Sequence, residues 1–343
     1  MIDLAALKKE AKQLLKDEKV TYLLGYRQGS NGHRAVPAFI REPEEVEQLT
    51  WDPTCTYNLT RYLIDEVRER NSSEEREDRP VGILVKGCDN RAINVLLQEK
   101  YLRKEDVHVI GISCEHAGMV DEKKLARELK NQPVMEIEFG EGDRFVVTTE
   151  EGKTTISAEK ILADRCLECK ASYPAGAEVI FGDKVKREFT RPYKGLQEIE
   201  TLPAGERWAF WKAQFEKCIR CYACRSVCTM CYCDECVVDS IELAVTADTT
   251  AEEKARKVRW AERSPVTSEN FTFHLTRAMH MAGRCVDCGE CERACPVDIP
   301  LRLLYAKLAR TADKMFDYEA GSDPDQPPLT SSFTMDDPGD FIR

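Results

Sequence analysis

The sequence predicts an α/β N-terminal domain with a mostly parallel sheet, followed by a mainly α-helical domain built around cysteine runs. Over residues 18–110, short apolar runs with the flanks of buried strands alternate with amphipathic helical segments. Strand–helix–strand order implies a parallel sheet. From Arg207 onward, helical segments are instead interrupted by closely spaced cysteines. We therefore expect one domain over 1–195, a second over 205–318, and an extended tail over 319–343.

The first domain is expected to begin with an amphipathic helix and two strands around the turn GSNGH. Its elements in chain order are a helix over 1–20, strands over 20–28 and 35–40, a helix over 58–71, a buried strand over 79–89, a helix over 91–102, a buried strand over 106–114, a helix over 121–131 and hairpin strands over 134–161. A linker is expected over 186–206. The Pro-, Asp- and Ser-rich tail is interpreted as lying on a partner or being disordered.

Charge and hydropathy exclude some functions. The chain has 343 residues, of which 50 are Lys or Arg and 61 are Asp or Glu, giving a formal net charge of −11. This acidic balance, without a long basic run, argues against nucleic acid as a partner. No apolar stretch approaches the roughly 18 residues that span a bilayer, and the N-terminal helix lacks the apolar core of a signal peptide. We expect no membrane span and a cytoplasmic location.

The sixteen cysteines indicate metal binding. In a cytoplasmic chain they are not expected to form disulfides, because the cytosol keeps thiols reduced. Two runs share the spacing C-x2-C-x2-C-x3-C, and the second ends in Pro296. In two-cluster ferredoxins, three thiolates of each run hold one [4Fe-4S] cluster and the fourth reaches the other cluster. The spacing therefore predicts cluster 1 on Cys218, Cys221, Cys224 and Cys295, and cluster 2 on Cys285, Cys288, Cys291 and Cys228.

Zinc is the alternative metal for these runs, because thiolate zinc sites also use C-x2-C pairs. Three cysteines in series, twice over, overfill a tetrahedral site, which favours iron–sulfur clusters. Thr229 stands where proline is commonest after the first run. Arg220, Arg225 and Arg284 are expected either to tune the cluster potentials or to form surface ion pairs.

The segment ENFTFHLTRAMHMAGRCVDCGECERACPVDIPLRLLYAKL, with a helix before the second run and another after it, resembles α-helical ferredoxin modules of heterodisulfide-reductase and glycerol-3-phosphate-dehydrogenase iron–sulfur subunits. The long segment between Cys228 and Cys285 is unlike small bacterial ferredoxins. His274 and His280 on the leading helix are expected to pack or hydrogen-bond rather than to bind metal.

Four further cysteines are widely separated along the chain. Cys88 and Cys114 each follow a predicted buried strand, and Cys166 and Cys169 form a C-x2-C pair. Because the carboxyl ends of parallel strands meet at one sheet edge, where ligand sites gather, the pair could complete a four-ligand site there. Zinc remains an alternative occupant of this site.

The pieces VGILVKGCD, GISCEH and CLECKASYPAGAEVIFGD resemble the β-subunit family of deazaflavin (coenzyme F420) hydrogenases and dehydrogenases, which includes formate-dehydrogenase β subunits. The resemblance covers roughly residues 20–190, with the dicluster module fused behind it. It implies that Cys88, Cys114, Cys166 and Cys169 hold a third [4Fe-4S] cluster.

The same resemblance implies a possible FAD beside that cluster. The stretch LTWDPTCTYNLTRYL lies where the family places a flavin-contacting turn and helix, so that Cys55 and Asn58 become candidate flavin-side residues. No Gly-x-Gly-x-x-Gly fingerprint supports a Rossmann site. The Gly-rich GYRQGSNGH is interpreted as a hairpin turn rather than a phosphate cradle.

Four cysteines are left over: Cys55, Cys231, Cys233 and Cys236. They could hold a fourth [4Fe-4S] cluster with Cys55 joining the two domains. Alternatively, some are buried free thiols that pack as small hydrophobes. A third interpretation makes the three C-terminal ones a docking or redox-active site. FAD and a fourth cluster would compete for the region around Cys55.

Two functional hypotheses follow. The chain is an electron-transfer subunit of an anaerobic oxidoreductase complex, between a catalytic subunit (formate dehydrogenase, hydrogenase or methylenetetrahydrofolate-reductase type) and a heterodisulfide-reductase-like flavoprotein or ferredoxin. Alternatively, it binds FAD and exchanges hydride with a deazaflavin or nicotinamide. His116 and Asp121 are candidates for lining a substrate pocket, or alternatively for supporting other site residues or lying at the surface. A redox sensor is disfavoured, since the chain is acidic and has no helix-turn-helix signal.

Overall fold

The computed structural model describes residues 2–30, 33–73, 77–114, 118–184, 191–233, 236–238, 248, 250–256 and 264–333. The chain forms two compact units. Unit 1 comprises Met1–Pro192, Val286–Gly289 and Ala320–Arg343, and unit 2 comprises Tyr193–Cys285 and Glu290–Glu319. Unit 1 therefore includes two short pieces that come from the second half of the sequence.

The centre of unit 1 is a five-stranded sheet in the order β2-β1-β3-β4-β8. Strands β1, β3, β4 and β8 are parallel, and β2 pairs with β1 as an antiparallel edge strand. Every residue of β3 is buried, as expected for a strand covered on both faces. The predicted mostly parallel sheet is confirmed. The strands are β1 (Leu23–Gln28), β2 (Ala35–Ile40), β3 (Val81–Val85), β4 (Val107–Ile112) and β8 (Val179–Phe181).

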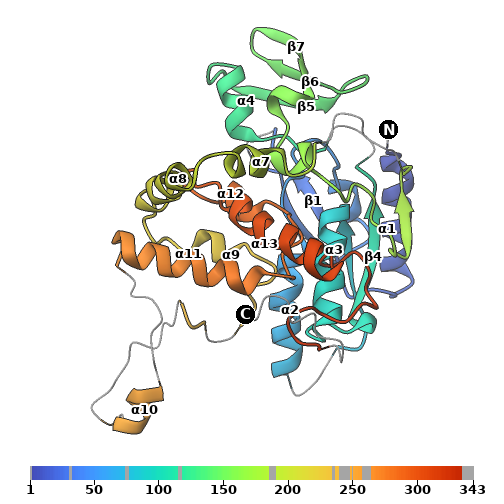
Figure 1. The fold of residues 1–343 in the computed structure, drawn as a ribbon. Helices are drawn as coiled ribbons and strands as arrows, with labels where there is room; N and C mark the ends of the chain where they lie inside the picture. Colours follow the sequence, from blue (N-terminus) through green and yellow to red (C-terminus); the bar gives the residue numbers. More distant parts are fainter. Residues whose placement is uncertain are drawn as a thin grey trace. The chain divides into compact units, whose positions relative to one another are not determined.

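Helices flank this sheet in unit 1 (Figure 1). Helix α3 starts immediately after β3 and packs on β3 and β4, while α2 packs on β3. The Asp3 carboxylate caps the N-terminus of α1 by accepting a hydrogen bond from the Ala6 backbone N–H (2.9 Å). The helical elements here are α1 (Leu4–Lys16), η1 (Glu45–Gln48), α2 (Thr60–Ser72), α3 (Gly87–Gln98), η2 (Lys104–Asp106) and α6 (Asp164–Leu167).

A second sheet of unit 1 has three antiparallel strands in the order β5-β6-β7. Figure 1 shows it beside α4 at the top of the view. The alternation in FVV places Phe145 and Val147 in a core with Ile137 and Ile156. The sequence predicted hairpin strands over this region, and the structure extends them to a three-stranded meander. Its elements are α4 (Glu122–Glu128), β5 (Val134–Phe139), β6 (Arg144–Thr149), β7 (Gly152–Ser157) and α5 (Ala158–Ile161).

The tail returns to unit 1 and lies on α3. The side chains of Arg91 and Asn94 donate hydrogen bonds to the carbonyls of Ala320 and Gly321, both at 2.9 Å. The Gln98 amide donates to the carbonyls of Asp323 (2.6 Å) and Gln326 (2.9 Å). Side chains of α3 thus hold residues 320–326 by donating hydrogen bonds to backbone carbonyls of this segment.

Unit 2 is helical in its described part. Helix α8 packs on α11 through aromatic side chains: Trp208 stacks on Phe271, and Phe215 stacks on His274. The predicted linker over 186–206 contains helix α7, because Leu196 and Ile199 recur at helical spacing and are buried. The helices are α7 (Lys194–Glu200), α8 (Ala204–Glu216), α9 (Ala223–Ser226), α10 (Ala251–Arg256), α11 (Thr267–Met281), α12 (Glu290–Arg293) and α13 (Leu301–Phe316).

Within the described residues, none of the helices combines the length and the apolar character needed to cross a bilayer.

Candidate metal centres and an adjoining cavity

The two ferredoxin-type loops share one backbone geometry. In the first loop Arg220 and Tyr222 have left-handed φ values of 56° and 60°, and in the second Asp287 and Gly289 have 57° and 68°. These residues occupy the same two positions in each C-x2-C-x2-C repeat. Alternation of right- and left-handed residues turns backbone N–H groups into a concave nest that suits anions, including iron–sulfur sites. The loops therefore fit the group that their cysteines predict.

In unit 2, the structure brings the four cysteines of predicted cluster 1 to one cavity. Cys218, Cys221, Cys224 and Cys295 all line it, together with His274 from α11. The thiols of Cys224 and Cys295 are buried, whereas Cys221 is exposed. Four thiols around one cavity match the donor set of a cubane.

The cysteines of predicted cluster 2 come from both units. Cys228, Cys285 and Cys291 belong to unit 2, whereas Cys288 lies in the 286–289 segment of unit 1. In unit 2, the Cys228 thiol lies 3.8 Å from the Met281 sulfur at the end of α11. Ligation of a cluster by these four stays a prediction.

Arg277, which the sequence analysis did not single out, lies beside the unit 2 cysteines. Its guanidinium donates to the Cys224 thiol at 3.1 Å and to the Tyr305 hydroxyl at 2.9 Å. Only 2% of the residue is exposed. The usable signal was its spacing: it follows His274 by three residues, on the buried face of α11.

The three arginines that the sequence did select also lie in unit 2, and Arg220 lines the same cavity as the cluster 1 cysteines. Arg220 is buried over the Phe273 ring (4.5 Å) and donates to the Glu269 carbonyl at 2.8 Å. Arg284 lies over the Tyr232 ring at 5.3 Å. A hydrogen bond from Cys228 lowers the pKa of the Cys231 thiol, and the nearby charge of Arg225 acts in the same direction. These arginines therefore pack on aromatic rings or lie near sulfur.

Unit 1 gathers its four predicted cluster 3 cysteines from three segments. Cys88 lies at the start of α3, Cys114 follows β4, and Cys166 and Cys169 lie in and after α6. The Cys114 backbone N–H donates to the Ser172 carbonyl at 2.9 Å. A β-carbon on Gly87 would lie 2.1 Å from the Ala171 carbonyl oxygen, so only glycine permits this approach. The carboxyl ends of β3 and β4 and the 166–173 segment thus meet, as the sheet-edge prediction requires.

Two thiols of this group accept backbone hydrogen bonds. The Met119 N–H donates to the Cys166 sulfur at 3.5 Å, and the Ala171 N–H donates to the Cys169 sulfur at 3.3 Å. Such bonds also stabilise a thiolate. Burial, followed by the charge of Asp89, raises the pKa of the Cys88 thiol. Metal binding at Cys88 therefore has to release the thiol proton.

Arg165 connects other parts of unit 1. Its guanidinium donates to the carbonyls of Thr56 and Cys288. It therefore tethers the Cys288 segment to the helix that carries Cys166. It is 8% exposed, and its charge acts on Cys88 in the direction that favours a thiolate.

A buried charge network flanks Cys88. The Lys86 ammonium lies 2.8 Å from the Asp89 carboxylate, and it donates to the Tyr26 hydroxyl (2.6 Å) and the Tyr57 carbonyl (2.7 Å). Burial opposes the charge on Lys86, but Asp89 and Tyr26 outweigh burial and raise the pKa of Lys86. The cation is therefore paired and fully satisfied.

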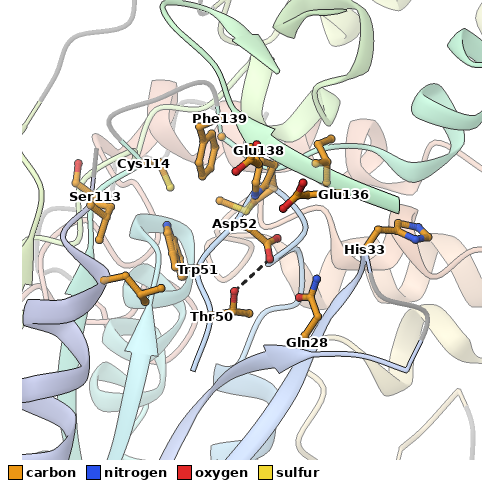
Figure 2. Close-up of a pocket in the computed structure, with 16 residues that line it drawn as sticks. Gln28, His33, Thr50, Trp51, Asp52, Ser113, Cys114, Glu136, Glu138 and Phe139 are labelled. Atoms are coloured by element: carbon orange, nitrogen blue, oxygen red, sulfur yellow. Dashed lines mark hydrogen bonds between the residues drawn. The ribbon is translucent and has the colours of Figure 1, made fainter. Parts of the chain in front are cut away.

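Unit 1 contains a cavity of about 570 Å³ with Cys114 in its wall. Figure 2 shows Trp51 and Asp52 on one side of the cavity, opposite Glu138 and Phe139 of β5. Ligand cavities typically combine such an aromatic and apolar lining with a few polar groups. The remaining lining residues are Ile2, Leu4, Gln28, His33, Thr50, Pro53, Ser113, Gly118, Met119, Glu136 and Ile137.

The predicted flavin-side residues, Cys55 and Asn58, are not among the residues that line this cavity. Cys55 is fully buried, and its sulfur accepts a hydrogen bond from the Asp52 N–H at 3.4 Å. Burial and then the charge of Asp52 raise the pKa of the Cys55 thiol. The Asn58 amide oxygen accepts a hydrogen bond from the N–H of Thr60, the first residue of α2, at 3.0 Å. Thr50, Trp51, Asp52 and Pro53 of the same turn face the cavity instead.

The other leftover cysteines lie in unit 2. Cys231 and Cys236 are half-buried and Cys233 is exposed. Because Cys55 belongs to unit 1, the fourth cluster stays a prediction. Asp121 is the N-cap of α4 and accepts from the Lys124 N–H at 2.9 Å. His116 lies outside the described residues.

Comparison with known proteins adds a family and relatives. Residues 78–231 match a family model that describes the C terminus of the coenzyme F420 hydrogenase/dehydrogenase beta subunit. The chain is 21% identical to the F420-dependent formate dehydrogenase subunit beta of Methanocaldococcus jannaschii, over 93% of this chain and 92% of the relative. It is 25% identical to the F420-dependent formate dehydrogenase 1 subunit beta of Methanococcus maripaludis, over 92% and 90%.

A chain in a solved structure of the F420-reducing [NiFe] hydrogenase complex from Methanosarcina barkeri also aligns, with 17% identity and a TM-score of 0.37. That alignment covers 48% of this chain and 58% of the other.

Proposed function

We propose that this chain, a member of the coenzyme F420 hydrogenase/dehydrogenase β-subunit family through residues 78–231, is an iron–sulfur electron-transfer subunit of a cytoplasmic, anaerobic oxidoreductase complex. It relays electrons between a catalytic subunit (formate dehydrogenase, hydrogenase or methylenetetrahydrofolate-reductase type) and a heterodisulfide-reductase-like flavoprotein or a ferredoxin. The relatives that match along nearly their whole length are formate dehydrogenase subunits, which supports a redox partner of this kind.

The observation that carries the proposal is the convergence of thiols within each unit. In unit 2, Cys218, Cys221, Cys224 and Cys295 line one cavity. In unit 1, the segments that bear Cys88, Cys114, Cys166 and Cys169 are hydrogen-bonded or packed together. A [4Fe-4S] cluster at such a site supplies one-electron transfer. The protein holds the cysteines, donates backbone N–H groups to sulfur and places positive side chains nearby.

The test is anaerobic reconstitution of the full chain, with iron and sulfide analysis and paramagnetic resonance after dithionite. We expect about twelve irons for three cubanes, and about sixteen where the leftover cysteines hold a fourth. Stoichiometric zinc, or no paramagnetic signal in the reduced protein, would overturn the proposal.

Single replacements assign the sites. Cys221→Ser should lose about four irons, because this thiol lines the unit 2 cavity. Cys55→Ser in the same preparation distinguishes three clusters from four. Unchanged iron in that variant removes Cys55 from the ligand set.

The unit 1 cavity favours a second candidate function, a flavoprotein that exchanges hydride with a deazaflavin or nicotinamide. Its volume of about 570 Å³ is in the range of small-molecule sites, and Cys114 of the predicted cluster 3 forms part of its wall. The aromatic faces of Trp51 and Phe139 suit a planar ring. Stoichiometric FAD in the purified chain, reduced by a hydride donor, would support this function. A Trp51→Ala variant should then lose the FAD while it retains its iron.

A further inference from the structure

The inward face of α11 carries a buried guanidinium between cysteines. Besides its bonds to the Cys224 thiol (3.1 Å) and the Tyr305 hydroxyl (2.9 Å), Arg277 donates to the Cys224 carbonyl at 3.2 Å. Its other terminal nitrogen lies 3.6 Å from the Cys231 sulfur. The guanidinium also lies over the Phe273 and Tyr305 rings, each 5.6 Å from the ring centroid. All these groups belong to unit 2.

Arg277 has no carboxylate partner among the described residues. None of the ion pairs between described residues involves it, and the groups whose negative charge acts on it are the Tyr305 hydroxyl and the thiols of Cys224, Cys231 and Cys228. Its Nε also makes no hydrogen bond in the described part of the chain. A buried cation without a counter-charge costs several kcal/mol. Because a tyrosine hydroxyl ionises only near pH 10, sulfur is the available counter-charge.

Arg277 also lies near cysteines of both predicted cluster sets. Cys224 belongs to the predicted cluster 1 set, and the Cys231 thiol accepts a hydrogen bond from Cys228 of the predicted cluster 2 set. The Cys231 backbone N–H donates to the Cys228 carbonyl at 3.2 Å. The Arg277 guanidinium therefore contacts the sulfur of Cys224 in the predicted cluster 1 set directly. It reaches the sulfur of Cys228 in the predicted cluster 2 set through the Cys231 thiol.

We propose that Arg277 is the shared counter-charge of the predicted cluster 1 site and of the predicted cluster 2 set to which Cys228 belongs, and that it raises the reduction potential of both. The proposal rests on the proposed function, because it requires clusters at these sites. Reduction adds one negative charge to a cluster, and a cation held against its ligand sulfur stabilises the reduced form more than the oxidised form. The effect is larger at the site of Cys224, which Arg277 contacts directly, than at the site of Cys228.

The test is a redox titration of the reconstituted full chain, followed by paramagnetic resonance. In Arg277→Met, which keeps an unbranched apolar stem without the charge, we expect the equilibrium constant for reduction to fall at least tenfold at one cluster. For one electron this is a shift of about 59 mV to more negative potential. A smaller fall in the same direction is expected at the second cluster. Equilibrium constants for reduction that stay within threefold of the wild type at both clusters in this variant would overturn the proposal.

Two further variants control the test. Arg310→Gln removes an arginine of the same unit that pairs with Glu200 (2.6 Å) rather than with sulfur, and it should leave both equilibria within twofold of the wild type. Arg277→Lys keeps the charge, so both equilibria should stay within threefold. If Arg277→Met assembles no clusters, Arg277→Lys decides. In Arg277→Lys, clusters with near-native potentials support the proposal. Loss of the clusters, or a tenfold fall in the equilibrium constant for reduction, shows that the shape of the guanidinium matters rather than its charge, and overturns the proposal.

Failure of the underlying function gives a different result. A wild-type chain that binds no iron, or shows no signal after dithionite, contradicts the iron–sulfur assignment itself. Wild-type signals that do not change in Arg277→Met contradict only the role of Arg277.

Discussion

Units 1 and 2 gather cysteines in different ways, and they also treat the nearby positive charge differently. Unit 1 assembles its thiols from three segments at one edge of a parallel sheet, and its buried Lys86 is paired with Asp89 at 2.8 Å. Unit 2 uses short loops between helices, and its buried Arg277 faces sulfur and a phenol. In unit 1 Asp89 neutralises Lys86, and another buried cation, Arg165, acts on Cys88. In unit 2 Arg277 remains available to the cysteine site.

The largest expected effect tests the pairing in unit 1. Asp89→Asn keeps the shape of the side chain but leaves the Lys86 ammonium buried without a counter-charge. Breaking one partner of a buried pair costs about 3–5 kcal/mol, so the free energy of unfolding in urea should fall by that amount. The matched control is Asp65→Asn, which removes an exposed partner of Arg61 (3.0 Å) and should cost about 0–1 kcal/mol. Equal costs for both variants would show that Lys86 is not a buried cation.

A second variant tests how the unit 1 segments meet. In Gly87→Ala the new methyl group would lie 2.1 Å from the Ala171 carbonyl oxygen and 2.8 Å from its carbon. Because the atoms that the methyl group would meet are backbone atoms of Ala171 and Tyr173, no side chain can rotate away, and the 166–173 segment must shift away from Cys88. We expect a cost of about 1–3 kcal/mol and loss of iron from the unit 1 site only. Gly205→Ala, where a β-carbon would have nothing within 4 Å, is the control. Full iron retention in Gly87→Ala would separate this packing from metal binding.

The two cysteine sites also differ in what the sequence could predict. The spacing of the runs identified Cys218, Cys221, Cys224 and Cys295 as one set, and the structure places all four around one cavity. Local spacing sufficed because two short loops supply the set. The set of unit 1 required the sheet: Cys88 and Cys114 come together only because β3 and β4 are parallel neighbours. The mostly parallel sheet itself was predictable from its buried, β-branched runs.

Helical spacing could place Arg277 on the buried face of α11, but local patterns could not predict its partners or the cavity. An arginine on a helix normally faces solvent, and nothing in its neighbours along the chain reveals that Cys224 and Tyr305 surround it. The cavity draws on β5, the turn after η1 and the end of β4, which are far apart in sequence. The helix α7 was missed because its seven residues carry only a short apolar stripe. Long-range packing decides each of these features.

The smallest expected effect concerns His274, the neutral counterpart of Arg277 on the same face of α11. It is 1% exposed, and neither ring nitrogen has a hydrogen-bond partner within the described chain. Burial, and then the charges of Arg277 and Arg220, lower its pKa to about 3. Its unfolded pKa is near 6.5. Between these values the unfolded chain binds a proton that the folded chain does not, so stability rises with pH and is lost as pH falls below about 6.5.

This loss amounts to about 1.4 kcal/mol per pH unit. His274→Phe should keep the aromatic stack on Phe215 and remove the titration. Between pH 6.5 and 5.5 its free energy of unfolding should therefore fall less steeply than that of the wild type. Urea unfolding followed by tryptophan fluorescence measures this, since Trp208 and Trp211 pack in the same helix pair. The control is His280→Phe, which replaces an exposed histidine of α11 and leaves every cysteine in place. Its free energy of unfolding should change with pH as steeply as that of the wild type. If the free energy of unfolding falls equally steeply with pH in all three proteins, His274 is protonated in the folded chain. The buried face of α11 then carries a second positive charge beside Arg277.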